Sequence, residues 1–410
     1  MPKLLAVSDD CRYFSGVALQ SRKVLRGLVK ANWDVAQIGY TRIPHSPDPV
    51  TVDGIRVYPV MNAQGYNDAY AFRVIMQKEK PDIVWIFNDP RFYSWLFDMD
   101  CEIRPFAKIV YWHLWDNGPF PLFNVPWYKS VDEIVAISFF THTLLEQIGI
   151  SAPYIPHGYD PKEFFRVSNK EREKLRNDFF THNGLSDIDF IIFVNSRNLE
   201  RKRLADIIVA YKRFFKTHPK SLLILHTDII DPEGPNLQRV AYEVEPGDET
   251  VIFAPGYVTT KQLRVFYNIS DIHVTIPFAE GFGLTVGESL LCGTPVIATR
   301  TGGIVEQMDD GSRTFGWLVE PTVRTVFGNP RDAYIWRDYV SIETVVEALV
   351  EAYDECHAIN GKPWEMLRTK GRQHIIDYFS EDAMVEKWVT FLNGVLQKPK
   401  TYYRYELIKV

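Results

Sequence analysis

Short apolar runs alternate with amphipathic stretches along most of the chain, and this alternation restricts the possible folds more than any other feature. Stretches such as 17–31 place apolar side chains on one face and basic side chains on another, which predicts helices. The apolar runs of the first half, which predict buried strands, lie at 4–8, 35–39, 55–59, 83–87, 109–112 and 134–137. Strands that alternate with helices form parallel sheets covered by helices on both faces. We therefore expect an α/β protein with doubly wound sheets.

The alternation pauses at 155–161, a stretch with the proline, glycine and aspartate residues of a linker, and then restarts. The second set of predicted strands lies at 190–194, 222–225, 251–253, 272–276, 295–298 and 316–319, and the last sixty or so residues are predicted to be helical. A chain of 410 residues is too long for one ordinary core. We expect one Rossmann-like domain over residues 1–160 and a second over 161–380.

Composition excludes several classes of protein. The net charge of -6 disfavours binding to nucleic acid or anionic membrane through a general basic excess. The cysteines stand far apart without a Cys-x-x-Cys pair, which fits a reducing compartment and disfavours a zinc cluster or a disulfide framework. No apolar region fits a signal peptide, and no apolar run approaches the roughly 18 residues of a membrane-spanning helix. We expect a cytoplasmic protein with at most peripheral membrane contact.

A glycine-containing stretch, 277–290, follows one predicted strand and opens a predicted helix. Gly281 and Gly283 fall in the strand-to-helix loop, where glycine lets the backbone approach a ligand closely. The free N–H groups of the first helical turn and the positive end of the helix dipole favour an anion there, such as a diphosphate. Glu288 can accept hydrogen bonds from the hydroxyls of a ribose, and Glu280 can reach a sugar at the far end of the same ligand. For this loop alone, a solvent-facing helix start with well-placed acidic residues is the alternative.

A basic stretch, 195–203, lies at the carboxyl end of another predicted strand. In open α/β sheets, ligands bind at those strand ends. Arg197 and Lys202 can pair there with phosphate oxygens, each charge-assisted bond contributing roughly 1.5–3 kcal/mol. For Arg201 and Arg203, a solvated basic helix terminus is the preferred interpretation.

Together these motifs resemble the retaining glycosyltransferases of family 4. The Glu-x7-Glu signature of that family matches Glu280 and Glu288 in spacing, and its Arg-x4-Lys diphosphate clamp matches Arg197 and Lys202. The resemblance covers nearly the whole chain, most strongly from about residue 155 to 320. It implies the GT-B fold, in which two Rossmann-like doubly wound domains face each other across a cleft.

Three further segments carry the resemblance. Residues 293–306 follow the family pattern, and 255–258 match the loop whose backbone holds the nucleotide base. The linker 155–160 is similar to the family's Ile-Pro-Asn-Gly-Val-Asp, with His157 and Tyr159 as departures.

The resemblance implies a metal-independent, retaining transfer of a hexose from a nucleotide diphosphate sugar, such as a UDP- or GDP-hexose, to the hydroxyl of a glycan or lipid-linked glycan. Neither a prosthetic group nor a metal is expected, because cationic side chains and helix N-termini neutralise the leaving diphosphate. The catalytic residues that it implies are Glu280, Arg197, Lys202 and His113. The donor-binding residues that it implies are Gly16, Ser196, Gly256, Tyr257, Val258, Gly281, Phe282, Gly283, Leu284, Thr285 and Glu288.

The N-terminal half is expected to bind the acceptor. Gly16 stands where the family commonly has a pair of glycines, and His113 closes a predicted strand where the family often places a histidine near the donor sugar. A purely structural role is the alternative for His113. The residues that can contact an acceptor are Trp115, Asp116 and Asn117. By the same resemblance the chain end, 381–410, returns to the N-terminal domain.

Other interpretations remain open. A related fold can glucosylate a hydroxymethylated base in DNA, which would require base flipping and a basic track along the phosphates. A nucleotide-sugar epimerase, a phosphorylase or a nucleotide-sugar-binding module without turnover are further candidates. The basic face formed by Arg22, Lys23, Arg26 and Lys30 can meet anionic lipid, although a solvated face is favoured. The Asp98-Met99-Asp100 spacing is interpreted as a solvated helix end rather than a metal site.

Overall fold

The computed structural model describes residues 1–41, 48–61, 68–119, 122–244, 251–329, 332–359 and 361–399. The chain forms two compact units. Unit 1 comprises Met1–Trp115, Phe120–Gly158 and Glu381–Val410, and unit 2 comprises Asp116–Pro119 and Tyr159–Ser380. The segment Asp116–Pro119 therefore packs with unit 2, although the predicted N-terminal domain over 1–160 contains it. Of the predicted return segment 381–410, residues 400–410 lie outside the described part of the chain.

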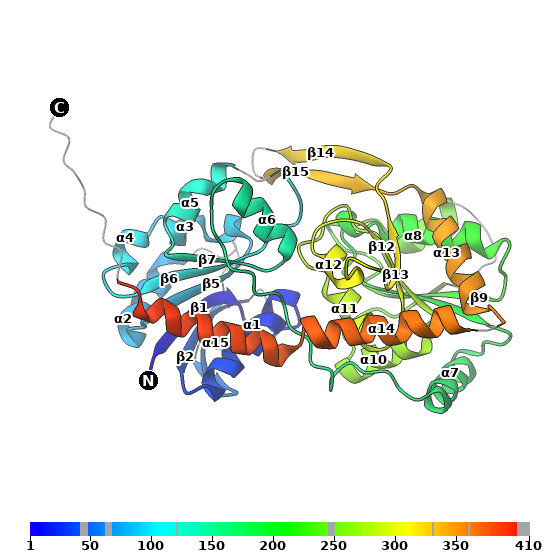
Figure 1. The fold of residues 1–410 in the computed structure, drawn as a ribbon, viewed down its shortest axis with the longest axis horizontal. Coiled ribbons are helices and arrows are strands. Elements are labelled where there is room, and N and C mark those ends of the chain that lie inside the picture. Colours follow the sequence, from blue (N-terminus) through cyan, green and yellow to red (C-terminus); the bar gives the residue numbers. More distant parts are fainter. Residues whose placement is uncertain are drawn as a thin grey trace. The chain divides into compact units, whose positions relative to one another are not determined.

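Unit 1 is built on a sheet of strand order β3-β4-β2-β1-β5-β6-β7, in which β3 is an antiparallel edge and the other neighbours pair in parallel (Figure 1). Its strands are β1 (Lys3–Asp9), β2 (Asp34–Thr41), β3 (Val50–Val52), β4 (Ile55–Met61), β5 (Ile83–Asn88), β6 (Lys108–His113) and β7 (Glu133–Ala136). Its helices are α1 (Gly16–Lys30), α2 (Ala69–Glu79), α3 (Ser94–Phe97), α4 (Asp100–Ile103), α5 (Val125–Lys129), α6 (Phe139–Gln147) and α15 (Glu381–Gln397), with short η1 (Pro90–Tyr93) and η2 (Leu122–Asn124).

The last helix, α15, packs in unit 1 against α1 (Figure 1). Gly27 allows this close approach, because a Cβ atom at that position would lie 2.4 Å from the side chain of Val385. On its inner face Trp388 is fully buried, with its ring centroid 5.6 Å from that of Trp85 and 5.2 Å from that of Trp112. The burial of this aromatic ring fixes α15 to the sheet of unit 1.

The basic face of α1 serves the same packing. Arg26 forms an ion pair with Glu381, at the start of α15, and the Lys23 Nζ atom donates to the Gly158 carbonyl at 3.0 Å. Arg22 pairs with Asp53 at 2.8 Å. The interpretation of this face as solvated is therefore wrong for Lys23 and Arg26, whose partners come from segments distant in sequence, whereas the pair of Arg22 with Asp53 is partly exposed.

Unit 2 is built on a parallel sheet of strand order β10-β9-β8-β11-β12-β13 (Figure 1). Its strands are β8 (Phe190–Asn195), β9 (Ser221–His226), β10 (Val251–Phe253), β11 (Ile272–Thr275), β12 (Val296–Thr299) and β13 (Gly316–Val319). Its helices are α7 (Asn169–Asn183), α8 (Leu204–Phe215), α9 (Leu237–Arg239), α10 (Thr260–Ile269), α11 (Leu284–Leu291), α12 (Ile304–Met308), α13 (Ile342–Cys356) and α14 (Lys362–Tyr378), with short η3 (Glu200–Lys202) and η4 (Val240–Val244). This order, outward from β8 on one side and from β11 on the other, is that of a doubly wound dinucleotide-binding sheet.

The core of unit 2 lies between this sheet and its helices. Strand residues such as Ile192, Leu223 and Val274 are fully buried and pack against apolar residues of α8 and α13. The sequence analysis does not anticipate the antiparallel hairpin of β14 (Val323–Asn329) and β15 (Asp332–Tyr339). Within the described residues, no helix combines the length and the apolarity that crossing a bilayer requires.

Candidate functional site

The strand order of unit 2 reverses between β8 and β11, which are hydrogen-bonded neighbours. In open α/β sheets, ligands bind at the carboxyl ends of the strands at such a switch point. The basic stretch 195–203 follows β8, and the glycine-containing stretch 277–290 follows β11. The topology therefore brings the two sequence motifs to one place.

Glu280 lies at the centre of this site. Lys202 forms an ion pair with its Oε2 atom, and the Arg201 Nη1 atom donates to the same oxygen at 2.9 Å. The Glu280 side chain is only 12% exposed. Burial alone would raise the pKa of Glu280, but the charges and hydrogen bonds of Lys202 and Arg201 outweigh it and hold the pKa well below its usual range. Glu280 is therefore an ionised carboxylate between two cations.

The two cations are not equivalent. Arg201 also donates to the Ala279 carbonyl at 3.1 Å, so it anchors the loop that carries Glu280. Burial, followed by the charge of Arg201, lowers the pKa of Lys202 below its ordinary value despite the attraction of Glu280. A bound anion would favour the charged form of Lys202 further, because it adds a second opposite charge beside the ammonium.

The expectation that Arg201 and Arg203 form a solvated helix terminus is wrong. Arg203 is buried at the start of α8, where it donates to the Val340 carbonyl at 2.9 Å and lies over the ring of Phe278. Both guanidinium groups are covered by segments more than seventy residues away in sequence, such as Ala279 and Val340, and no local pattern indicates this.

The partners of Arg197 differ from those of Lys202. Its Nε atom donates to Asp231 at 2.7 Å, and its Nη2 atom donates to Glu233 at 2.9 Å. Its side chain is half exposed. The two members of the predicted clamp therefore stand on the same connection after β8 but are held by different carboxylates.

The backbone of the glycine loop, 280–283, is held by contacts from α12 and from its N-cap residue Gly303. Gly283, the N-cap of α11, has φ 89°, a conformation that favours glycine. Gln307 donates to the Phe282 carbonyl at 2.6 Å, and the Gly303 amide donates to the Glu280 carbonyl at 3.1 Å. These contacts engage the carbonyl groups of the loop, and among the first-turn N–H groups of α11 that of Val286 donates to the Gly283 carbonyl at 3.0 Å.

Tyr159, which departs from the family pattern, braces the same helix. A Cβ atom at Gly287 would lie 2.2 Å from its ring, so the ring lies directly on α11. Its hydroxyl donates to Gln307 at 2.5 Å, and its ring stacks on that of Phe282. No sequence pattern predicts a role for Tyr159 or Gln307, because their mutual contact forms only in the folded chain.

Glu288 belongs to a polar network along the carboxyl edge of the sheet. The Tyr267 hydroxyl donates to Glu288 at 2.9 Å, and the Asn195 side chain donates to Tyr267 at 2.9 Å. The His226 ring lies 2.8 Å from Asn195 Oδ1 and 3.1 Å from the Gly256 carbonyl. Burial lowers the pKa of His226. The network thus joins the predicted ribose residue to the predicted base-binding loop.

The remaining predicted donor residues of unit 2 lie around this edge. The Ser196 amide donates to the His226 carbonyl at 3.3 Å, and Gly256 has φ 80°. Tyr257 is exposed, whereas Val258, Leu284 and Thr285 are half-buried and Gly281 is buried. His226 and Tyr267 are not among the site residues predicted from the sequence. His226 could have been predicted, because it ends a strand at the edge of the sheet where ligands bind.

Two of the predicted acceptor residues belong to unit 2. Asn117 is buried, and its amide donates to Asp338 at 2.8 Å and to the Trp336 carbonyl at 3.0 Å. The Asp116 carbonyl accepts from the Glu280 amide at 3.2 Å. Asn117 therefore secures the hairpin strand β15, and the Asp116 backbone supports the loop of Glu280.

The other predicted residues lie in unit 1. His113 is fully buried at the end of β6, with Nε2 2.7 Å from the Tyr128 hydroxyl. Burial lowers the pKa of His113 to about 3, so the ring is neutral at physiological pH. Trp115 is also buried, and Gly16 is exposed as the first residue of α1.

Comparison with known proteins finds a family match and similar sequences for part of the chain. The model of the family "Glycosyl transferases group 1" matches residues 176–326, a range that contains Lys202, Glu280 and Glu288. The chain is 25% identical over 159 residues to alpha-monoglucosyldiacylglycerol synthase of Acholeplasma laidlawii, covering 38% of each protein. It is 38% identical over 85 residues to D-inositol 3-phosphate glycosyltransferase of Pseudarthrobacter chlorophenolicus, covering 21% of this chain and 19% of that protein. These matches span less than half the length of the relatives.

Solved structures match over almost the whole chain. Sucrose-phosphate synthase from Thermosynechococcus elongatus superposes with a TM-score of 0.73 at 18% identity, covering 96% of this chain and 99% of that one. HepE of Anabaena, in complex with UDP-glucose, superposes with a TM-score of 0.70 at 15% identity, covering 96% and 100%. At such identities the likeness shows the fold, which is GT-B. The family match, the relatives named as glycosyltransferases and the fold together support a glycosyltransferase of GT-B architecture.

Proposed function

We propose that this chain is a retaining glycosyltransferase that moves a hexose from a nucleotide diphosphate sugar to an acceptor hydroxyl. One observation carries the proposal: Glu280, Lys202 and Arg201 meet beside the N-terminus of α11, at the switch point of a dinucleotide-binding sheet. The site offers Lys202 and a helix N-terminus for a diphosphate, and one carboxylate, held by Arg201, for the sugar.

The donor is proposed to lie along the carboxyl edge of unit 2. Its diphosphate binds Lys202 and the first-turn amides of α11. Arg197 is the second cation of this clamp, because a diphosphate offers its guanidinium a bidentate partner in place of Asp231 and Glu233. The ribose binds Glu288, and the base binds the loop 255–258. HepE, which shares the fold, was solved with UDP-glucose, and this supports a UDP-hexose as the first donor to test.

Transfer then requires charge stabilisation. As the bond from the anomeric carbon to the diphosphate breaks, Lys202 and Arg197 neutralise the leaving group. The acceptor hydroxyl attacks on the face that the diphosphate leaves, so the configuration is retained, and the leaving phosphate takes the proton. Glu280 is ionised by its two cationic neighbours, so it stabilises positive charge on the sugar ring rather than donating a proton. This scheme needs no metal ion.

The acceptor is proposed to be a glycan or a lipid-linked glycan in the cytoplasm. A relative named as a glucosyldiacylglycerol synthase supports a lipid acceptor. His113, proposed as a catalytic residue near the donor sugar, and Trp115, proposed to contact the acceptor, both lie in unit 1, where they are buried. Because burial keeps the His113 ring neutral, its proposed contribution is hydrogen bonding rather than positive charge.

A thermal-protection screen of UDP-, GDP- and ADP-hexoses tests the donor, since a ligand that binds only the folded protein stabilises it by mass action. We expect one nucleotide class to raise the unfolding temperature of the wild type and to have little effect on Lys202→Ala. Incubating that donor without an acceptor is the companion assay. Conversion of the donor sugar into its epimer there would contradict the proposal and indicate an epimerase.

A further inference from the structure

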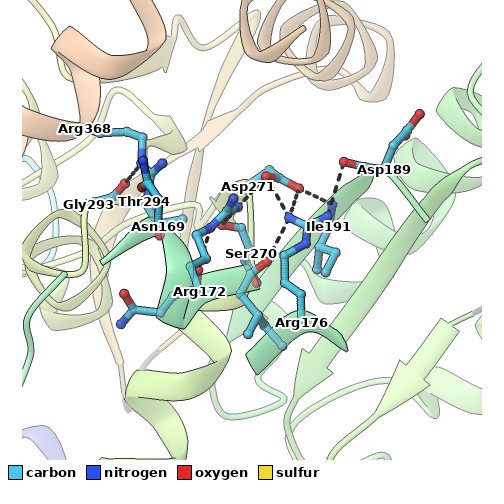
Figure 2. A network of polar contacts seen from close by, with 12 residues as sticks. Asn169, Arg172, Arg176, Asp189, Ile191, Ser270, Asp271, Gly293, Thr294 and Arg368 are labelled. Atoms are coloured by element: carbon cyan, nitrogen blue, oxygen red, sulfur yellow. Dashed lines mark hydrogen bonds and ion pairs between the residues drawn. The ribbon is translucent and has the colours of Figure 1, made fainter. Parts of the chain in front are cut away.

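A second polar cluster lies at the amino edge of the unit 2 sheet, the opposite edge from Glu280. Asp271 directly precedes β11, and its buried carboxylate accepts from Arg172 at 2.6 Å and from Arg176 at 2.9 Å (Figure 2). The same carboxylate accepts from the Ile191 amide at 2.8 Å, near the start of β8. Both arginines stand on α7, so this carboxylate fixes that helix against the sheet.

A cavity of about 460 Å³ opens beside these arginines. Its size falls within the roughly 300–1,000 Å³ of small-molecule sites. Residues of α7 line one side, including Asn177 and Phe180, and Arg368 of α14 lines another. The cavity thus combines guanidinium groups, side-chain amides and one aromatic face.

Arg368 is the residue that points to a ligand. It is only 8% exposed, and its Nε atom donates to the Gly293 carbonyl at 2.7 Å (Figure 2). Within the described residues, its two Nη atoms form no hydrogen bond and no carboxylate pairs with it. Burial and the neighbouring positive charges of Arg172 and Arg166 lower its pKa to about 10, although Glu365 and Asp271 act in the opposite direction. A buried cation without a carboxylate at ion-pair distance is costly, and an anion in the cavity would reduce that cost.

The charged side chains around the cavity carry an excess of positive charge, which an anion would neutralise. Arg166 is already paired with Glu365 at 2.6 Å. The carboxylates near the cavity are Asp271, shared by two arginines, and the exposed Glu173 at its rim. Three guanidinium groups therefore face two carboxylates.

We propose that this cavity is a second binding site, for a small phosphorylated molecule, separate from the donor site at the other edge of the sheet. The guanidinium fork of Arg368, with Arg172 and Arg176 beside it, matches the oxygens of a phosphate monoester. Phe180, over whose ring the Arg176 guanidinium lies at 5.7 Å, provides an apolar surface for the organic part of the ligand.

Calorimetric titration of the full-length protein with phenyl phosphate and with inorganic phosphate, at fixed ionic strength, tests this site. We expect saturable binding of both probes, with phenyl phosphate tighter because its ring can contact Phe180. Arg368→Gln should weaken phenyl phosphate binding by at least about tenfold, the size of one charge-assisted contact. If neither probe saturates, or if Arg368→Gln binds like the wild type, the proposal is overturned.

Arg372→Gln is the matched control. Arg372 stands on the same helix and donates to the Leu291 carbonyl at 2.6 Å, so it also supports the end of α11, but it does not line the cavity. Its substitution should leave probe affinity unchanged. An equal loss in Arg372→Gln and Arg368→Gln would show that helix packing, and not ligand contact, is responsible, and would refute the site.

Two rim variants keep the test valid if Arg368→Gln fails to fold. Asn177→Glu adds a negative charge to the exposed side of α7 and should weaken binding, whereas Glu173→Gln removes one and should tighten it. Tighter probe binding in Asn177→Glu or weaker probe binding in Glu173→Gln would contradict an anion site. Lys202→Ala should leave probe binding intact. Loss of binding in Lys202→Ala alone would place the probe at the donor site, overturning this inference while leaving the proposed function standing.

Discussion

Glu280 accepts from both Lys202 and Arg201 through one carboxylate oxygen, so the proposed catalytic carboxylate and the proposed diphosphate ligand Lys202 are in direct contact. Lys202 is the cation with the most to gain from a ligand, since burial has already lowered its pKa. Arg201 is tied to the backbone of the loop as well, so its part is to hold Glu280 in place.

The first prediction concerns Lys202. In Lys202→Ala, the donor should bind at least roughly tenfold more weakly, because one charge-assisted contact of about 1.5–3 kcal/mol is lost. Calorimetric titration of the donor identified by thermal protection measures this. Unchanged affinity would refute the role given to Lys202.

The second prediction concerns Glu280. In Glu280→Gln, donor affinity should stay within a few-fold of the wild type, while kcat should fall by roughly 10²–10³, as when one preorganised electrostatic contact is removed. Because the pKa of Glu280 lies well below its usual range, the wild-type rate should show no loss from this group as the pH falls from 7 to 5. A rate that instead declines through the ordinary range of a carboxyl group would indicate an unpaired Glu280.

The sequence predicts the meeting of Glu280 with Lys202 because both follow strands whose carboxyl ends share one edge. It does not predict the burial of Arg203 or the second contacts of Arg201. Those depend on Val340 and Ala279, which reach the site only after the chain has folded.

At the scale of elements, α11 is the part that positions the site. Its N-terminus carries the glycine loop, and its flank at Gly287 is in contact with Tyr159. The parallel strands of both sheets lie within a few residues of the predicted ranges, because buried parallel strands are apolar throughout. The short antiparallel edge strand β3 was not predicted. The hairpin β14–β15 was missed because the side chains of β14 from Val323 to Phe327 are exposed and charged residues interrupt both strands.

The third prediction concerns this packing. Gly287→Ala should destabilise unit 2 by about 1–3 kcal/mol, the usual cost of overpacking, because the new methyl group meets the Tyr159 ring. The cost should be smaller in a Tyr159→Ala background. Denaturant unfolding of the single and double variants measures both values, and equal costs in the two backgrounds would exclude the contact with Tyr159 as the cause.

At the scale of the whole molecule, the chain forms two compact units, each with its own sheet and core. Unit 1 includes α15 from the end of the chain, and unit 2 carries the proposed donor site. Separate cores are expected to unfold as separate cooperative transitions.

The fourth prediction follows from this division. Trp388→Ala should lower the unfolding transition of unit 1, since removal of a buried Trp costs about 3–5 kcal/mol. The bound donor should raise the transition of unit 2. Differential scanning calorimetry of wild type and variant, with and without donor, measures both shifts, and a single transition that moves with both changes would contradict independent units.

The most direct measurement is a crystal structure of the protein with the nucleoside diphosphate that gives thermal protection. We expect the diphosphate at the N-terminus of α11 within hydrogen-bonding distance of Lys202, and the ribose on Glu288. A nucleotide bound elsewhere, with Lys202 still paired only with Glu280, would refute the proposed donor site.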